Sequence, residues 1–305
     1  MCKPSIFEYH PTPIVEIQHP RAQQTGIKLL IKREDLNHPF VSGNKWWKLK
    51  YNLEAAIQLD HKTILTFGGA YSNHIYATAA ACRELGLKSI GIIRGEETLP
   101  LNPTLSFAKE CGMELQYVSR EAYRKKNNEA FIQNLKDQFG DFYLIPEGGT
   151  NELALKGVKE FAQSLSKEVE FDYLCLPVGT GGTIAGMIEG LDDSKKVLGF
   201  VSLKGGEFLE QEIQTYTDGT NFNLLHDYHF GGYAKMTQSL TDFTNQFEKD
   251  HSIQLDPVYT SKMMFGVFDL VRKGFFKKDS VVMILHTGGL QGRPYKIISG
   301  KNLNF

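Results

Sequence analysis

The sequence predicts an α/β fold with two domains, each built on an open, mostly parallel, twisted sheet flanked by helices. Short β-branched runs alternate with segments of helical spacing, and the apolar runs lack the strict alternation of strands with one face in solvent. The length of 305 residues favours two domains, because one core seldom grows beyond about 250 residues. No linker rich in proline or serine separates two halves. We therefore expect interleaved domains: a smaller one of residues 46–148, and a larger one of residues 1–45 plus 149–305.

The alternation of apolar runs places each expected element along the chain. Strands are expected at Lys28–Glu34, Thr63–Gly69, Lys88–Gly95, Leu115–Ser119, Phe142–Gly149, Tyr173–Gly182, Lys196–Leu203 and Val281–Gly289. Helical spacing occupies Lys45–Leu59, Asn73–Leu85, Pro103–Cys111 and Glu152–Leu165. Four of the strands run into paired glycines, which also close ordinary tight turns. Four such turns together favour one ligand cleft, because open α/β sheets bind ligands beyond the carboxyl ends of their strands.

Composition argues against several classes of partner. Lys and Arg total 34 against 35 Asp and Glu, so no global field attracts nucleic acid or an anionic membrane. No apolar run approaches the roughly 18 residues of a membrane span, and the N-terminus lacks the apolar stretch of a signal peptide. Cys2, Cys82, Cys111 and Cys175 lie far apart, so neither a zinc site nor a disulfide framework is expected. We expect a cytoplasmic protein that binds no metal, membrane or nucleic acid.

A glycine loop, PVGTGGTIAGM at Pro177–Met187, follows a predicted strand and opens an apolar helix. Backbone N–H groups and the helix dipole hold a phosphate in this context, and Thr180 and Thr183 add hydroxyl donors. The dinucleotide pattern fails at Ile184, and the Walker pattern fails at Met187. The loop is therefore interpreted as a cup for a phosphate monoester, with a plain turn as the alternative.

Lys45 stands between the turn Ser42-Gly43-Asn44 and a predicted helix. Cations are disfavoured at the positive end of a helix, so this position lowers the pKa of the amine. A neutral amine is what Schiff-base chemistry requires. The alternative is a solvated surface lysine, and Lys48 and Lys50 are interpreted in that way.

A second group of polar residues lies between a predicted strand and an alanine-rich predicted helix: Ser72, Asn73 and His74. Ser and Asn are good helix N-caps, which explains them without any ligand. The functional alternative is that Ser72 presents its hydroxyl to a ligand while Asn73 binds a ring oxygen. For His74 a structural role competes with a ligand role. Later loops add Tyr233, Tyr259, Thr260 and Thr287, each of which alone also fits packing or a strand end.

In order, Gly-Asn-Lys, Ser-Asn-His, Gly-Thr-Gly-Gly-Thr, Asp-Pro-Val-Tyr-Thr and His-Thr-Gly-Gly span about Lys32 to Gly289. Together they resemble the pyridoxal-phosphate enzymes of the D-cysteine desulfhydrase and 1-aminocyclopropane-1-carboxylate deaminase group. The resemblance implies the tryptophan-synthase-β-like fold (fold type II). It places pyridoxal 5'-phosphate in the cleft between the two domains, bound to the larger one. It also implies an amino-acid substrate and a homodimer.

The resemblance implies a role for each matched residue. Lys45 would carry the cofactor as a Schiff base and act as the catalytic base. The remaining cofactor contacts would come from Asn73 at the ring hydroxyl, Gly179, Thr180, Gly181, Gly182 and Thr183 at the phosphate, and Thr287 at the pyridine nitrogen. Ser72, Tyr233 and Tyr259 would be catalytic, and the substrate would contact Ser72, Asn73, His74, Tyr259 and Thr260.

Two positions separate the activities of this group. In the deaminases a glutamate follows the Val-Tyr pair and the position of Thr287 is apolar, whereas this chain has Thr260 and Thr287. A threonine hydroxyl at the ring nitrogen supports a weaker electron sink than a carboxylate, which suits expulsion of a thiol better than ring opening. We expect α,β-elimination of D-cysteine, or a related D-amino acid, to pyruvate, ammonia and sulfide. The alternatives are 1-aminocyclopropane-1-carboxylate deamination to 2-oxobutyrate and ammonia, or a non-catalytic protein that binds a phosphorylated ligand or the cofactor.

Other positions depart from the usual pattern of that group. Ser42-Gly43 replaces a pair of glycines, Trp46 and Trp47 replace smaller polar residues, and Ile75, Tyr76 and Ala77 follow Ser-Asn-His. These departures bear on the identity of the substrate rather than on the cofactor.

Overall fold

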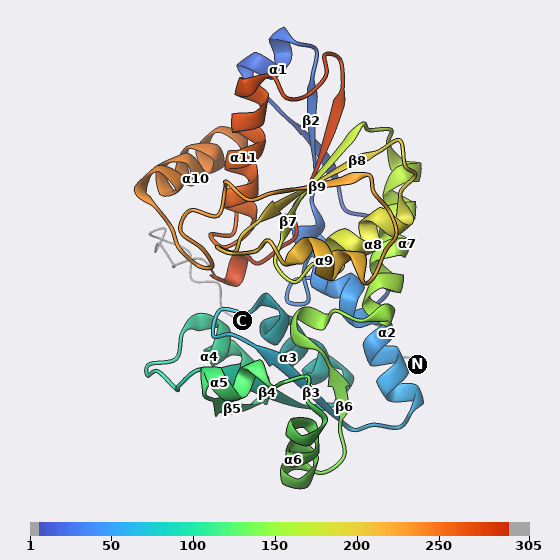
Figure 1. The fold of residues 1–305 in the computed structure, drawn as a ribbon, viewed down its shortest axis with the longest axis vertical. Helices are drawn as coiled ribbons and strands as arrows, with labels where there is room; N and C mark the ends of the chain where they lie inside the picture. The colour runs from blue at the N-terminus through green and yellow to red at the C-terminus, as the bar shows by residue number, and fades with distance from the viewer. Residues whose placement is uncertain (1–5, 293–305) are drawn as a thin grey trace.

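The computed structural model describes residues 6–292, which form two units, each built on a mostly parallel sheet, with the larger above the smaller in Figure 1. The predicted fold class is confirmed: mostly parallel sheets are flanked by helices in both units. Cys2 lies outside the described residues, whereas Cys82, Cys111 and Cys175 are buried and free. No helix within residues 6–292 combines the length and the apolar character that crossing a membrane requires.

The larger sheet has six strands in the order β1-β2-β10-β7-β8-β9. Their bounds are β1 Ile14–Ile17, β2 Lys28–Lys32, β7 Tyr173–Val178, β8 Lys196–Val201, β9 Phe222–Leu225 and β10 Val281–Leu285. Only β1 runs antiparallel to its neighbour among these pairs. Its helices are α1 Pro20–Gln24, α7 Glu152–Glu168, α8 Gly182–Gly190, α9 Leu209–Gln214, α10 Gln238–His251 and α11 Thr260–Lys273. One apolar core packs against α7 and α8, and another packs against α10 and α11.

The smaller sheet has four parallel strands in the order β5-β4-β3-β6. Their bounds are β3 Thr63–Gly68, β4 Lys88–Arg94, β5 Glu114–Val118 and β6 Tyr143–Ile145. The helices are α3 Asn73–Leu85, α4 Pro103–Glu110, α5 Arg120–Arg124 and α6 Glu129–Phe139. Short 3₁₀ turns at η1 Glu34–Leu36, η2 Glu147–Gly149 and η3 Leu290–Gly292 complete the described elements.

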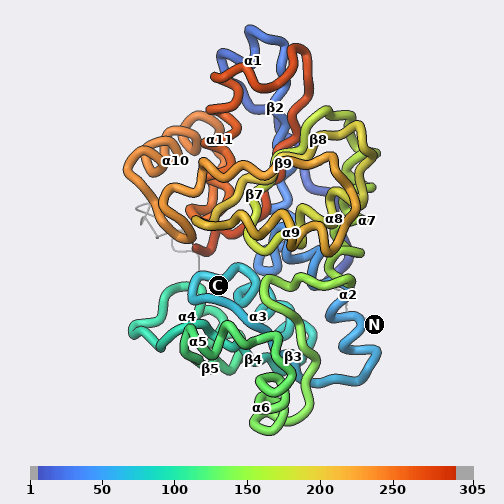
Figure 2. The backbone as a smooth tube through the Cα atoms, in the orientation of Figure 1, coloured from blue at the N-terminus to red at the C-terminus, as the bar shows by residue number. Residues whose placement is uncertain are grey.

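Helix α2, Asn44–Gln58, connects the two units. The tube in Figure 2 follows it from the larger unit to the edge of the smaller one. Its backbone contacts α7 closely, since a Cβ on Gly157 would lie 2.1 Å from the Trp47 carbonyl oxygen. Trp46 and Trp47 are buried in this contact, and the Trp47 indole donates to Glu34 Oε2 at 2.7 Å. The strands of the smaller sheet all lie inside the predicted segment 46–148, and the exact division into domains stays a prediction.

The predicted elements are all present, and the differences lie at their ends. Helix α3 has the predicted bounds, and α2 begins one residue before the predicted Lys45. Strands stop earlier than expected where glycines follow; β7 ends at Val178 rather than Gly182. The sequence prediction omitted β1 and β9, which are four-residue strands at the two edges of the larger sheet.

Candidate active site

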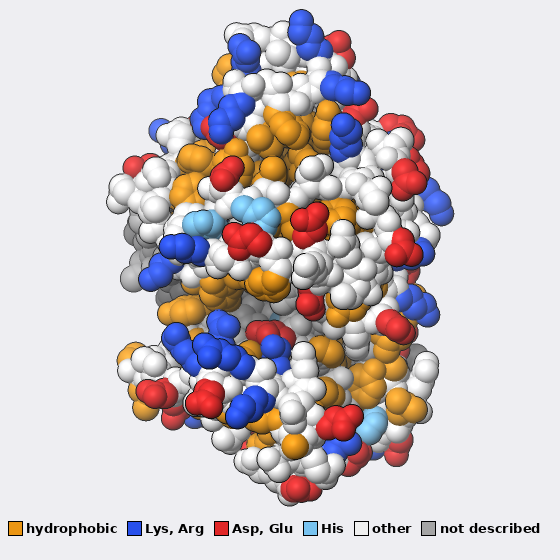
Figure 3. Space-filling model, in the orientation of Figure 1, with side chains coloured by type: hydrophobic (Ala, Val, Ile, Leu, Met, Phe, Trp, Pro, Cys, Tyr) orange, Lys and Arg blue, Asp and Glu red, His pale blue; other side chains and the backbone are white. Residues whose placement is uncertain are grey.

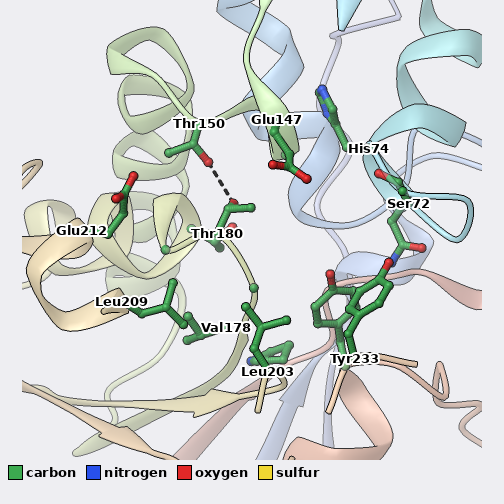
Figure 4. A pocket seen from close by; sticks show the side chains of 18 of the residues that line it. Ser72, His74, Glu147, Thr150, Val178, Thr180, Leu203, Leu209, Glu212 and Tyr233 are labelled. Atoms are coloured by element: carbon green, nitrogen blue, oxygen red, sulfur yellow. Dashed lines mark hydrogen bonds between the residues drawn. The ribbon is translucent and has the colours of Figure 1, made fainter. Parts of the chain in front are cut away.

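A cavity of about 700 Å³ lies between the two sheets, at the carboxyl ends of strands from both. Loops after β3, β6, β7 and β10 supply its walls, so the clustering of strand-end turns expected from the glycines is present. Figure 4 shows Ser72, Glu147, Thr180 and Tyr233 around this common space. Most of the predicted site residues line it: Lys45, Ser72, Asn73, His74, Gly179, Thr180, Gly181, Thr183, Tyr233, Tyr259 and Thr287.

Lys45 is the second residue of α2 and lines the cavity. Burial lowers the pKa of its amine from 10.5 to about 8, and the charge of Asp256 opposes that shift. The sequence argument attributed a lowered pKa to the helix terminus, whereas burial is the larger cause. Lys45 Nζ donates to Asn44 Oδ1 at 3.2 Å. A substantial fraction of this amine is therefore neutral near pH 8, as a nucleophile or a base requires.

Gly43 fixes where Lys45 lies. It has φ 70°, and an added Cβ would meet the Thr287 carbonyl oxygen at 1.9 Å. The turn before α2 therefore packs directly on the loop after β10. This contact brings Lys45 and Thr287 into the wall of one cavity.

The glycine loop after β7 leads into α8, whose first residue is Gly182 and whose N-cap is Gly181 at φ 79°. The Thr180 hydroxyl lies 2.9 Å from that of Thr150 (Figure 4), and Asn44 Nδ2 donates to Thr183 Oγ1 at 2.8 Å. Gly182 lies behind the lining residues, where a Cβ would sit 2.6 Å from Thr150. The N–H groups at the start of a nine-residue helix and two hydroxyls form a suitable cradle for a phosphate.

The interpretation of Lys48 as a solvated residue is wrong. Its side chain is 1% exposed, lines the cavity and donates to Thr150 Oγ1 at 2.8 Å. A Cβ on Gly182 would lie 3.0 Å from Lys48 Nζ, so this amine stands next to the glycine cradle. Burial and the charge of Lys45 hold its pKa well below 10.5. No carboxylate within residues 6–292 forms an ion pair with it, so a phosphate in the cradle would supply the missing negative charge.

Lys50 also differs from its interpretation as a solvated residue. It is half-buried and donates to Glu160 Oε1 at 2.9 Å, on the other side of α2 from the cavity lining. Lys45 and Lys48 have i, i+3 spacing, which places both on one face of the helix. This spacing could have predicted that Lys48, but not Lys50, lies in the site.

Ser72 and Asn73 combine both roles considered for them. The Ser72 hydroxyl is the N-cap of α3 and accepts from Ile75 N at 3.3 Å, yet it also lines the cavity. Asn73 Oδ1 accepts from Gln291 Nε2 at 2.6 Å. Its amide nitrogen lies 2.4 Å from where a Cβ on Gly289 would stand, so the loop after β10 packs against it.

His74 is 1% exposed and its protonation state follows from its partner. Thr66 Oγ1 donates to the Ile145 carbonyl at 2.8 Å, so it accepts from His74 Nε2 at 2.7 Å. Burial, then the charges of Lys45 and Lys48, hold the pKa of His74 well below 6.5. The ring is therefore neutral, and Nδ1 is a buried acceptor with no hydrogen-bond partner among the described residues.

Tyr233 and Tyr259 form an edge-to-face pair with ring centroids 6.1 Å apart. Burial raises the pKa of Tyr233 to about 12, and it raises the pKa of Tyr259 well above 10, with the charge of Tyr233 adding to it. Both hydroxyls are therefore protonated at neutral pH and are suited to give protons rather than to take them. Tyr233 Oη donates to the Tyr71 carbonyl at 3.2 Å.

Asp256 holds the turn that presents Tyr259. Its carboxylate accepts from the backbone N–H groups of Val258, Tyr259 and Thr260 at 2.8–2.9 Å. The Thr260 hydroxyl also donates to Asp256 Oδ2 at 2.9 Å. Thr260 is fully buried and lies outside the cavity lining, where its hydroxyl supports the turn. A direct contact of Thr260 with substrate stays a prediction.

The sequence analysis also missed Glu147, Arg94 and Lys126, which line the same cavity. Lys126 Nζ lies 3.3 Å from Glu147 Oε2. Arg94 ends β4, Lys126 follows α5 and Glu147 begins η2, so the three are far apart in sequence and no local motif marks them. Within residues 6–292, no three His, Cys, Asp or Glu side chains converge in a way that could hold a metal ion.

The described residues fit a pyridoxal phosphate molecule. The glycine cradle and unpaired Lys48 suit its phosphate, and Lys45 supplies the neutral amine that its aldehyde requires. The family model described as "Pyridoxal-phosphate dependent enzyme" matches residues 7–288. The chain belongs to this family. Its cofactor is pyridoxal 5'-phosphate, and the alternative of a protein without catalytic function is set aside by this membership.

Relatives within this enzyme family carry two kinds of name. A Pyrococcus horikoshii protein, provisionally named a 1-aminocyclopropane-1-carboxylate deaminase, is 31% identical over 89% of this chain and 87% of its own length. An Arabidopsis thaliana protein named a mitochondrial bifunctional D-cysteine desulfhydrase/1-aminocyclopropane-1-carboxylate deaminase is 30% identical over 94% of this chain and 78% of its own. The crystal structure of an ACC deaminase homologue superposes with a TM-score of 0.82 at 28% identity, covering 95% of this chain and 96% of that one.

Proposed function

We propose that this enzyme eliminates the β-substituent of D-cysteine, or a closely related D-amino acid, to give pyruvate, ammonia and sulfide. The observation that carries the proposal is the composition of one cavity: a lysine amine with its pKa lowered to about 8, two protonated tyrosines and the Thr287 hydroxyl. A base and an acid of these types are what removal of a Cα proton and departure of a sulfur group require.

Cofactor binding is assigned to residues of this chain. Lys48 and the N–H groups and hydroxyls of Gly179–Thr183 would hold the phosphate, Asn73 the ring hydroxyl, and Thr287 the ring nitrogen. When bound, the cofactor accepts the electron pair left on Cα after the proton departs. A hydroxyl at the ring nitrogen stabilises the protonated ring less than a carboxylate does. That arrangement suits a leaving thiol, with a pKa of about 8.5, better than a carbon leaving group.

The proposed reaction uses four side chains. The substrate amine takes the place of the Lys45 amine, and Lys45 then removes the Cα proton. Tyr259, with Tyr233 beside it, gives a proton to the leaving sulfur. Ser72 binds the substrate carboxylate through the hydroxyl that faces the cavity. Hydrolysis of the three-carbon product then releases pyruvate and ammonia.

The second candidate function is 1-aminocyclopropane-1-carboxylate deamination to 2-oxobutyrate and ammonia. The names of the relatives favour it. Thr260 and Thr287 favour elimination, because the deaminases have a glutamate and an apolar residue at these positions.

Product analysis with cofactor-loaded protein separates the two candidates. Pyruvate and sulfide from D-cysteine, with no 2-oxobutyrate from the cyclopropane substrate, would support elimination. 2-Oxobutyrate without sulfide would establish the deaminase and refute the argument from Thr287. In either case Lys45→Ala abolishes turnover, and retained activity in that variant would refute the role of Lys45.

We further propose that the enzyme is a cytoplasmic homodimer. Three buried cysteines that form no disulfide among the described residues support a reducing compartment, and the family resemblance supports the dimer. Light scattering coupled to gel filtration tests the dimer, and a mass of 34.4 kDa, that of one chain, would exclude it.

A further inference from the structure

A second cavity, of about 380 Å³, opens beside the first. Its lining consists of Arg94, Arg120, Tyr123, Arg124, Lys126 and Glu147. Arg94, Lys126 and Glu147 line both cavities, so the second is an annex of the active site rather than a separate pocket. We refer to it as the basic annex.

Positive charge dominates the basic annex. It carries four cationic side chains and one carboxylate, and that carboxylate, Glu147, lies 3.3 Å from Lys126. In the part of the chain that the structure describes, Arg94, Arg120 and Arg124 are exposed and form no ion pair. Figure 3 shows Lys and Arg side chains gathered at the cleft, over the region of β4, β5 and α5. Because the whole chain has a formal charge of −1, this concentration is local.

Tyr123 lines the annex and packs against two of its cations. It is 3% exposed, and its hydroxyl is buried without a hydrogen-bond partner among residues 6–292. The Arg94 guanidinium and the Lys126 amine lie 5.7 and 5.4 Å from its ring centroid, a geometry that holds both cations against the aromatic face. Burial and the charge of Glu147 raise the pKa of Tyr123, so the hydroxyl remains a donor. The Glu147 carboxylate is the candidate acceptor near the Tyr123 hydroxyl, whereas the guanidinium groups of the annex are unpaired within the described chain, so the excess positive charge indicates an anion as the missing partner.

Arg94 connects the annex to the proposed catalytic groups. A Cβ on Gly69 would lie 3.6 Å from Arg94 Nη2, at the start of the loop that leads to Ser72. The charge of Arg94 also acts on the Tyr233 hydroxyl. Because Arg94, Lys126 and Glu147 line both cavities, an anionic group in the annex lies next to the cavity that holds the proposed catalytic groups.

We propose that the basic annex binds a tetrahedral oxyanion, a phosphate or sulfate, carried on the β-substituent of the substrate. The substrate class of the enzyme then includes serine-type amino acids esterified with phosphate or sulfate; this step rests on the proposed elimination. Lys45 takes the Cα proton, the Cβ–O bond breaks, and its electron pair leaves with the oxyanion. One water is consumed in releasing pyruvate and ammonia, so an O-phosphoserine yields pyruvate, ammonia and phosphate.

The kinetic test compares O-phospho-D-serine with D-serine in the holoenzyme. Leaving-group chemistry alone favours the ester, so the decisive quantity is the change in the ratio of the two kcat/KM values when the annex is altered. Arg120 and Arg124 line only the annex. In R120Q/R124Q we expect the ratio to fall by about tenfold or more.

The matched control K109Q/K136Q removes two exposed cations from helices of the same unit and leaves the ratio unchanged. An equal ratio in R120Q/R124Q and wild type would overturn the proposal.

A binding measurement keeps this test independent of the proposed reaction. The probe is 3-phosphonopropionate, which has no amine and does not react, titrated calorimetrically into holoenzyme whose cofactor already fills the glycine cradle. We expect its dissociation constant to rise by about tenfold in R120Q/R124Q and to stay the same in K109Q/K136Q. If D-cysteine is not a substrate but this difference is found, the proposed function fails while the annex stands. Equal binding in all three proteins would refute the annex even in an active eliminase.

Discussion

Lys48 Nζ donates to Thr150 Oγ1 at 2.8 Å, one helical turn after Lys45 on the same face of α2. The Thr150 hydroxyl in turn lies 2.9 Å from that of Thr180 in the glycine loop. Helix α2 thus points two amines into one cavity, and we propose that one serves the reactive end of the cofactor and the other its phosphate. Lys48 has no ion-pair partner among residues 6–292, so a phosphate in the cradle would supply its compensating charge.

Replacing Lys48 by Met should weaken cofactor binding. Loss of a charge-assisted hydrogen bond to a phosphate costs about 1.5–3 kcal/mol, or roughly a 10- to 150-fold rise in the dissociation constant. Equilibrium dialysis of pyridoxal phosphate against the cofactor-free protein measures it. Lys50→Met, on the same helix but outside the cavity, is the control. Pyridoxal without a phosphate should bind K48M and wild type equally, and a loss of pyridoxal binding in K48M would indicate general damage instead.

Replacing Tyr259 by Phe should slow elimination most for a poor leaving group. The raised pKa keeps this hydroxyl protonated as a proton donor, and general acids contribute about 10²–10⁴ in rate. Hydroxide needs that proton more than a thiolate does, so kcat for D-serine should fall further than kcat for D-cysteine. Tyr228→Phe is the control, since its hydroxyl bonds to Asp269 outside the cavity lining. Equal losses on both substrates would contradict the acid role.

Replacing Gly43 by Ala should damage the site through backbone geometry. The added Cβ would meet the Thr287 carbonyl oxygen at 1.9 Å, and φ is 70°, so either α2 or the loop after β10 must move. We expect a destabilisation of about 2 kcal/mol or more, together with loss of cofactor binding. Urea unfolding and dialysis measure the two effects. Gly86→Ala tests the φ cost alone, because its φ is also 70° but an added Cβ meets nothing within 4 Å. A G43A protein no less stable than G86A would refute the role of the contact.

The sequence predicts the architecture well because parallel strands are marked by continuous apolar runs. The sequence prediction extends the strands too far, because glycines such as Gly179 continue the run in sequence but lie beyond the end of the strand in the structure. The edge strands β1 and β9 are too short and too mixed in character to stand out; β9 is only Phe222–Leu225. These errors affect strand ends and sheet edges, where pairing rather than composition decides.

The candidate site is predictable where a local motif carries it and hidden where only the fold assembles it. Lys45 and the glycine loop were found because turn, helix start and residue type coincide in sequence. Lys48 was missed because lysines are usually solvated, and its burial depends on Thr150, about a hundred residues away. Arg94 and Glu147 likewise meet only after β4 and β6 join one sheet.

Lys45 should give the cofactor-free protein a characteristic pH dependence. Burial lowers its pKa to about 8, while the unfolded chain keeps the proton up to about 10.5. Between these values the unfolded state binds more protons, so the contribution of Lys45 to the free energy of unfolding rises with pH. Below pH 8 both states are protonated, and the full cost of burying the charge destabilises the fold.

Lys45→Met should therefore stabilise the cofactor-free protein by ~3 kcal/mol at pH 7, with the advantage shrinking from pH 8 to 10. Urea unfolding of both proteins at pH 7, 8, 9 and 10 measures the difference, in which titrating groups that do not interact with Lys45 cancel. A difference that stays constant across that range would show that Lys45 keeps an ordinary pKa, and the base assigned to the reaction would have to be another group.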